Sequence, residues 1–170
     1  MQWRSLQGFT LIELLVVIAI IGILSTIVLV SLSTTRTSSA DTSIKANLAE
    51  IRAQAEIYAA EHYDSYGLFN GGAVPPLNSN SSCLTQSSGN MFADPTIKQA
   101  MTNARVSGNN VMTCFIAIDG KSWAVAIALK SNAANAWCVD SNGVSVLLTP
   151  SIDPPGGTSK ALSGSTHLCQ

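Results

Sequence analysis

Charged side chains are scarce in this chain, and neither sign is in excess. The 170 residues include nine Lys or Arg and ten Asp or Glu, which gives a formal net charge of -1. Proteins that bind nucleic acid usually present a basic surface, so no nucleic-acid partner is expected. A low charge density is common among secreted proteins, and it also suits a subunit that packs against copies of itself.

Residue types that carry catalysis or bind zinc are also few. The two histidines, His62 and His167, stand apart from any Ser/Asp or Cys/His nucleophile arrangement. The cysteines form no Cys-x-x-Cys or Cys/His cluster of the kind that binds zinc. The carboxylates of the central region are spaced as a solvated helix face: Glu50, Glu56, Glu61 and Asp64. We therefore expect a protein that is not an enzyme.

A long uncharged stretch lies near the N-terminus, directly after a single carboxylate. Residues 14–33 read LLVVIAIIGILSTIVLVSLS, and Glu13 precedes them. A helix of about 20 apolar residues spans a bilayer, and an ionised carboxylate within it costs about 3 kcal/mol or more unless it is paired. Because the chain offers no cation close by in sequence, we expect Glu13 to find its positive partner on another molecule.

Two simpler interpretations explain less of this segment. A secretory signal peptide has an apolar region of about 7–15 residues and a small-residue cleavage site, whereas this stretch is longer and has no Ala-x-Ala exit. A generic signal anchor accounts for the length, but it explains neither the Gly8-Phe9 step nor Glu13. The order of residues before the stretch is therefore the more specific signal.

That order resembles the N-terminus of type IV pilins and of type II secretion pseudopilins. In this family a short polar leader ends in Gly, and Phe-Thr-Leu-Ile-Glu and a long apolar helix follow. Residues 7–24 here read QGFTLIELLVVIAIIGIL. The resemblance implies that a prepilin peptidase cuts between Gly8 and Phe9 and methylates the new amino group of Phe9. It also implies that Glu13 attracts the N-terminal amine of a neighbouring subunit.

The same resemblance implies a function and a set of partners. The chain would be a structural subunit, held first as a single-pass protein of the inner membrane with its C-terminal domain outside the cytoplasm. An inner-membrane platform and a cytoplasmic ATPase would then assemble it into a homo-oligomeric helical filament, either a pilus or a periplasmic pseudopilus. The alternative is a membrane-anchored extracytoplasmic binding domain that does not polymerise. Many major pilins carry Pro at the position of Val30. The apolar sequence LLVVIAIIGIL at residues 14–24 resembles pseudopilins more than pilins.

Composition divides the whole chain into consecutive segments. These are a leader at 1–8, a transmembrane and filament-core helix at 9–32, an amphipathic continuation at 33–66, an αβ-loop region at 67–110, an antiparallel sheet at 111–149 and a tail at 150–170. Spacings of three and four give the continuation one packing face: Ile44, Leu48, Ile51, Ala55, Tyr58 and His62. Gly67 is suited to end this helix in a left-handed conformation.

Later segments predict a short helix and four strands. Asp94-Pro95 is an N-cap followed by Pro at the first helical position, with Ile97, Ala100, Met101 and Ala104 as its packing face. The strands are expected at 111–119, 122–130, 136–139 and 144–148, with turns at 120–121 and 140–143. The fold class is therefore α+β: a long N-terminal helix, transmembrane in its first half, packed on a small antiparallel sheet. Five aromatic residues are assigned to the helix–sheet core or its rim: Tyr58, Tyr63, Tyr66, Trp123 and Trp137.

An even number of cysteines in an exported region predicts two disulfides. Pairing Asp119 with Ser122 across the first hairpin places Cys114 opposite Ile127, and the register expected for the second hairpin places Cys138 opposite Ile127 as well. The two cysteines would then lie about 9.5 Å apart across two strand spacings, which is beyond the reach of a disulfide. A Cys114–Cys138 bond is therefore not expected.

Two pairings remain: Cys83–Cys114 with Cys138–Cys169, or Cys83–Cys138 with Cys114–Cys169. The resemblance favours the first, because many pilins link their C-terminal tail to the sheet in this way. The resemblance also raises calcium, which the major pseudopilin binds in a C-terminal loop through oxygen ligands. The oxygen-bearing residues of this region are Asp140, Asn142 and Asp153, but they match no EF-hand loop and suit turn hydrogen bonds equally, so no cofactor is expected.

Overall fold

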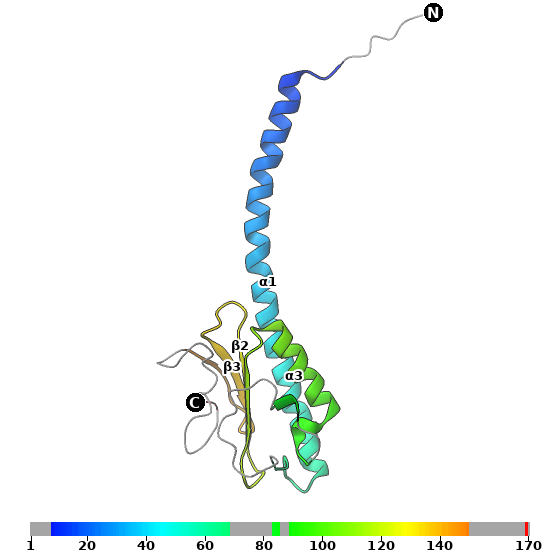
Figure 1. Ribbon diagram of the computed structural model, residues 1–170, viewed down its shortest axis with the longest axis vertical. Coiled ribbons are helices and arrows are strands. Elements are labelled where there is room, and N and C mark those ends of the chain that lie inside the picture. Colours follow the sequence, from blue (N-terminus) through cyan, green and yellow to red (C-terminus); the bar gives the residue numbers. More distant parts are fainter. Residues whose placement is uncertain (1–7, 69–82, 86–88, 150–168, 170) are drawn as a thin grey trace, which may run out of the picture. The chain divides into compact units, whose positions relative to one another are not determined.

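A computed structural model describes residues 8–68, 83–85, 89–149 and 169 (Figure 1). The chain forms two compact units, residues 1–36 and residues 37–170. Most of the leader, the greater part of the C-terminal tail, His167 and Asp153 lie outside the described residues.

Helix α1 (Leu11–Glu61) has 51 residues and contains both the apolar segment and most of its predicted continuation. Its middle part is rich in Ser and Thr, which are weak helix formers because their hydroxyls compete for backbone groups. Here the hydroxyls of Thr35 and Thr42 donate back to the carbonyls of Ser31 and Ser38, at 2.9 and 3.0 Å. This bonding pattern is compatible with a continuous helix, and the prediction of one long helix is confirmed.

The buried face of α1 lies in the second unit and differs from the expected face at its end. Its members are buried: Ile44, Leu48, Ile51, Ala55 and Ala59. Tyr58 is only partly buried, and His62 is exposed and stacked on the Tyr58 ring at 3.9 Å. Assigning His62 to the packing face was therefore wrong, because the i+4 step from Ala55 leads to Ala59.

The helix also ends earlier than Gly67. Tyr63 and Asp64 both take left-handed conformations, with φ of 58° and 55°, and the Asp64 N–H donates to the Ala59 carbonyl at 2.9 Å. Lys121 Nζ donates to the Asp64 carbonyl at 2.7 Å. A contact from a residue far away in the sequence thus stabilises a helix end that the local sequence does not predict. Tyr63 is 97% exposed, so it belongs neither to the core nor to its rim.

The short helix that follows was predicted correctly. Helix α3 (Pro95–Ser107) begins after Asp94, whose Oδ1 accepts hydrogen bonds from the N–H groups of Thr96 and Ile97 at 2.9 and 3.1 Å. Its buried residues are those of the expected face: Ile97, Ala100, Met101 and Ala104. A 3-10 turn, η1 (Met91–Ala93), precedes it and was not predicted; the Asn90 side chain caps this turn.

Four antiparallel strands form one sheet in the order β1-β2-β3-β4. They are β1 (Met112–Ile116), β2 (Trp123–Ala128), β3 (Ala136–Asp140) and β4 (Ser145–Leu148). The first two strands are shorter than expected because the β1–β2 connection is wider than a two-residue turn: the Ala117 N–H donates to the Ser122 carbonyl at 2.8 Å. Within the second unit, residues 37–61 of α1 and helix α3 cover one face of this sheet (Figure 1).

The observed register corrects the predicted one. Cys114 pairs with Val125 and Cys138 with Ala126, rather than both with Ile127. Adjacent residues of a strand point to opposite faces, so Cys114 and Cys138 lie on different faces of the sheet. A bond between them is excluded, as expected, because they lie on β1 and β3, two strand spacings apart. The faces they occupy exclude it as well.

Each disulfide belongs to a different face. Cys83 is bonded to Cys114 within the core that α1 and α3 share with the sheet. Cys138 is bonded to Cys169 in a smaller buried cluster on the other face, which includes Phe115, Ala124 and Ala126. This is the first of the two pairings left open by the sequence.

Candidate functional site

The first turn of α1 holds the residues that the sequence singles out. Gly8, Phe9 and Thr10 precede the helix and are exposed, and Phe9 exposes 84% of its surface. The helix begins at Leu11, so Glu13 lies in its first turn, where a carboxylate interacts favourably with the positive end of the helix dipole. The proposed cleavage site therefore adjoins a helix start and lies outside the helix itself.

Thr10 and Glu13 form a reciprocal cap at this helix start. The Thr10 N–H and the Thr10 hydroxyl both donate to Glu13 Oε2, at 2.9 and 2.8 Å. The Glu13 N–H in turn lies 3.3 Å from Thr10 Oγ1. This is a capping box, in which an N-cap Thr and an acidic residue three positions later satisfy each other's free backbone donors. The sequence carried the signal, Thr-x-x-Glu, but Thr10 was not recognised as part of the site.

The carboxylate is left with unused bonding capacity. Among the described residues, Thr10 is the hydrogen-bond partner of Glu13, and it occupies Oε2. A carboxylate has about four lone-pair sites on its two oxygens, so Oε1 remains open to a further donor. The geometry thus fixes the side chain at the helix start and still leaves it able to accept a hydrogen bond from a cation.

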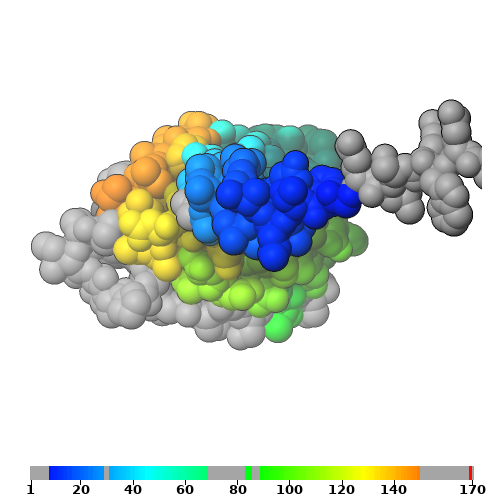
Figure 2. Space-filling model, turned by 90° about the horizontal axis from the view of Figure 1, so that it is seen from above, coloured from blue at the N-terminus to red at the C-terminus, as the bar shows by residue number. Residues whose placement is uncertain are grey.

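The apolar segment behind Glu13 is exposed along its length. The large apolar side chains described between Leu11 and Leu32 are all exposed, and the start of this helix is drawn in dark blue in Figure 2. The helix is long and apolar enough to cross a membrane, and none of its apolar window is buried inside the protein. Since a surface of this size is unfavourable in water, it needs lipid or protein as a neighbour. The segment is therefore not the core helix of a soluble domain.

The remaining candidate residues lie in the second unit. The exposed carboxylate of Glu56 accepts a hydrogen bond from the Tyr66 hydroxyl at 2.9 Å, so Glu56 is more than a solvated charge. Both oxygens of Asp140 are occupied by backbone N–H groups, and Asn142 is exposed. Within the described ranges, no group of three or more His, Cys, Asp or Glu side chains is placed to hold a metal ion.

A comparison with known protein families gives a match at the N-terminus of the chain. Residues 3–29 match the prokaryotic N-terminal methylation motif, the hallmark of precursors of type IV pilins and pseudopilins. The match covers the Gly8-Phe9 step, the capping box and most of the exposed apolar segment. Neither the curated proteins nor the solved structures contain a significant match to this chain.

Proposed function

We propose that this chain is a structural subunit of a type IV pilus-like or type II secretion filament, cleaved after Gly8 and assembled through its N-terminal helix. The observation that carries the proposal is an exposed apolar helix that begins with the methylation motif and a capped carboxylate. Families with this motif are structural, and catalysis plays no part in the proposal.

The exposed position of Gly8 and Phe9 supports processing. A peptidase needs an extended backbone in its active site, and both residues lie ahead of the helix. Cleavage would create a new amino terminus at Phe9, four residues before Glu13, and methylation would modify that amine. The chain would thereby gain a cation next to its only carboxylate in the apolar segment.

The proposed assembly step joins that amine to Glu13 of a neighbouring subunit. In the membrane, the apolar segment contacts lipid; in the filament, it contacts the same segment of other copies. Transfer of an unpaired charge into such an environment is costly, whereas an amine and a carboxylate from two subunits neutralise each other. Pairing between copies would also set the axial offset of one subunit from the next.

Extraction from the inner membrane requires work that this chain does not supply. A cytoplasmic assembly ATPase acting through an inner-membrane platform is the proposed source, and the prepilin peptidase is the partner before assembly. The motif supports this proposal in general terms, because it implies peptidase processing and filament assembly.

Intact mass and N-terminal sequencing of the protein from its own cells test the proposal. We expect a chain that begins with N-methylated Phe9. Recovery from the sheared surface fraction would identify a pilus, and retention of the processed chain with the cell envelope would identify a pseudopilus. A chain that still begins at Met1 in the membrane would refute the filament subunit and favour an anchored binding domain that does not polymerise.

A further inference from the structure

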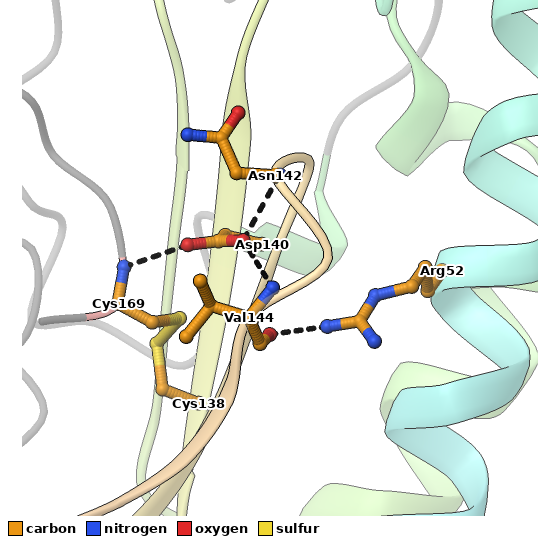
Figure 3. The surroundings of a disulfide bond; sticks show 6 residues. All are labelled: Arg52, Cys138, Asp140, Asn142, Val144 and Cys169. Carbon is orange, nitrogen blue, oxygen red and sulfur yellow. Dashed lines mark hydrogen bonds between the residues drawn. A yellow bond between two sulfur atoms is a disulfide. The ribbon is translucent and has the colours of Figure 1, made fainter.

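Asp140 is a fully buried carboxylate at the end of β3. Its Oδ1 accepts hydrogen bonds from the N–H groups of Asn142 and Val144, each at 3.0 Å. Its Oδ2 accepts one from the N–H of Cys169 at 3.1 Å (Figure 3). A buried charge is tolerated only when such donors replace water. Each oxygen therefore binds a different segment: Oδ1 binds the β3–β4 turn, and Oδ2 binds Cys169 near the end of the chain.

The position of Asp140 relates it directly to the second disulfide. Asp140 lies two residues after Cys138 on the same strand, so the two side chains share one face of the sheet. Cys169 is buried on that face and is bonded to Cys138. Figure 3 shows the carboxylate reaching the Cys169 backbone while the sulfurs meet beside it. One residue of the chain end is thus held at two points, its amide and its side chain.

The turn organised by Asp140 is also attached to helix α1. A guanidinium N–H of Arg52 donates to the Val144 carbonyl, and the Val144 N–H donates to Asp140 (Figure 3). The carboxylate is therefore held in place by a turn that is itself fixed against the helix. None of these contacts involves a sulfur atom, so the groups that hold the Asp140 carboxylate in place are distinct from those of the Cys138–Cys169 bond.

We propose that Asp140 is a positioning residue for disulfide formation: it binds the amide of Cys169 and places the Cys169 sulfur against Cys138 before the bond forms. The disulfide then locks a contact that is already present. Selection is needed because four cysteines allow three pairings. Cys114 faces the opposite side of the sheet, so a chain end docked on Asp140 meets Cys138 alone.

The oxidation itself requires an external disulfide, for example glutathione disulfide. The thiolate of one of the two cysteines attacks it, forms a mixed disulfide and releases one glutathione thiolate. The thiolate of the other cysteine attacks the protein sulfur of that mixed disulfide and releases the second. The dithiol loses two electrons, and the external disulfide gains them. Asp140 exchanges no electrons; it raises the effective concentration of one thiol at the other.

Reoxidation of the full chain in detergent tests the proposal. Wild type and Asp140→Asn are reduced, reoxidised in glutathione buffer, trapped by alkylation and mapped by mass spectrometry. We expect the equilibrium constant for Cys138–Cys169 to fall about tenfold or more in the variant, the size expected for loss of a hydrogen bond to a charged acceptor. The Cys83–Cys114 bond of the same molecules should form as in wild type and serves as the internal reference.

Asp119→Asn is the matched control, because Asp119 Oδ1 also accepts a backbone N–H, that of Lys121 at 2.9 Å, but in an exposed turn. Both disulfides should form normally in this variant. Closure of Cys138–Cys169 in Asp140→Asn with the wild-type equilibrium constant would overturn the proposal.

A second measurement decides the question even if Asp140→Asn fails to fold, which loss of Cys83–Cys114 would reveal. In Cys138→Ser, the Cys169 thiol is free while Asp140 is intact. If the carboxylate docks the chain end without the disulfide, maleimide should label Cys169 about tenfold or more slowly than in denaturant, as expected for a residue held by native contacts. Labelling at the denatured rate, with Cys83–Cys114 intact, would refute the proposal.

Discussion

Glu13 combines two interactions that are usually considered separately. Its carboxylate accepts two hydrogen bonds from Thr10 and so completes the start of its own helix. In the proposed filament, the same carboxylate also binds the amine of a neighbouring subunit. The cap holds the side chain in one place before that partner arrives, which lowers the entropy lost when the pair forms.

Replacing Glu13 should separate membrane insertion from assembly. Glu13→Ala and Glu13→Gln should insert and be processed normally, since the apolar segment and the Gly8-Phe9 step are unchanged. Breaking a buried ion pair by removing one partner costs about 3–5 kcal/mol, so filament yield, or intersubunit cross-linking for a periplasmic filament, should fall at least tenfold (about 1.4 kcal/mol). Glu50→Ala, which removes an exposed carboxylate of the same helix, is the control. Normal yield from Glu13→Gln would argue against a charge pair.

Thr10 offers a milder test of the same site. Thr10→Val keeps the size of the side chain but removes the hydroxyl that contacts Glu13, which should cost about 1 kcal/mol at the helix start. We expect faster amide hydrogen exchange over the first turn of α1 and a filament yield between those of wild type and Glu13→Ala. Thr10→Ser retains the hydroxyl and should match wild type. Equal exchange in the Val and Ser variants would show that the capping box contributes nothing.

Tyr66 predicts how the second unit responds to alkaline pH. Burial, together with the hydrogen bond to Glu56, raises the pKa of Tyr66 to about 12. Between the ordinary pKa of 10.0 and this value, the unfolded chain loses the phenol proton and the folded chain keeps it. The stability that this group contributes is therefore complete below pH 10 and is lost as pH rises through about 12.

Unfolding titrations of Tyr66→Phe should show a smaller loss of stability between about pH 10 and 12 than wild type. Burial also raises the pKa of Tyr58, so part of the decline should remain. At neutral pH the variant should lose about 1 kcal/mol with the hydrogen bond to Glu56. Tyr63→Phe, at a position 97% exposed, should leave the neutral-pH stability unchanged. The same pH profile in Tyr66→Phe and wild type would contradict the assignment.

Helix α1 places two kinds of surface on one element. The apolar side chains that the structure describes between residues 11 and 32 are exposed on every side of the helix, whereas residues 44–59 bury one face and expose the other. A helix that is apolar all round requires a non-aqueous environment, and one with a single apolar face packs on a domain. The change from one pattern to the other therefore marks where the environment of the helix changes, although the helix itself is continuous.

Two isoleucines on the second part of α1 provide a matched comparison of its faces. Ile51 is fully buried, and Ile57 is 51% exposed. Ile51→Ala should lower the free energy of unfolding by about 2–5 kcal/mol, because it removes buried atoms and leaves a cavity. Ile57→Ala should change it by less than about 0.5 kcal/mol. Denaturant unfolding measures both, and equal effects would contradict the assigned packing face.

The whole molecule consists of an exposed apolar segment and a domain with its own core. Residues 37–170 contain the buried part of α1, helix α3, the sheet and both disulfides. A chain that begins at residue 37 should therefore fold, with both disulfides formed and Trp123 buried, and should stay monomeric in solution because it lacks the apolar segment. Disulfide mapping, circular dichroism and sedimentation test this. A misfolded product would show that the core depends on the first 36 residues.

Local sequence patterns were sufficient to predict many of the elements of this protein. The methylation motif and the apolar segment are each continuous in sequence, so they can be recognised without knowing the fold. The Thr-x-x-Glu signal of the cap is equally local, although Thr10 was not recognised from it. Helix α3 was predicted with its cap and its buried face because Asp94 and Pro95 act on the turn that follows them. Four strands could be located for the same reason, since alternation and turn residues are local signals.

Contacts between residues far apart in the sequence determined the parts of the structure that local patterns did not predict. The β2–β3 register, which places Cys138 opposite Ala126, determined that Cys138 lies on the other face of the sheet from Cys114. Lys121 donates a hydrogen bond to the Asp64 carbonyl at the end of α1. Asp140 accepts one from the N–H of Cys169, which lies 29 residues later in the chain. No short stretch encodes such contacts, because they exist only once the sheet has formed. The sequence alone determined what the N-terminal segment is; the tertiary structure determined which residues hold the C-terminal domain together.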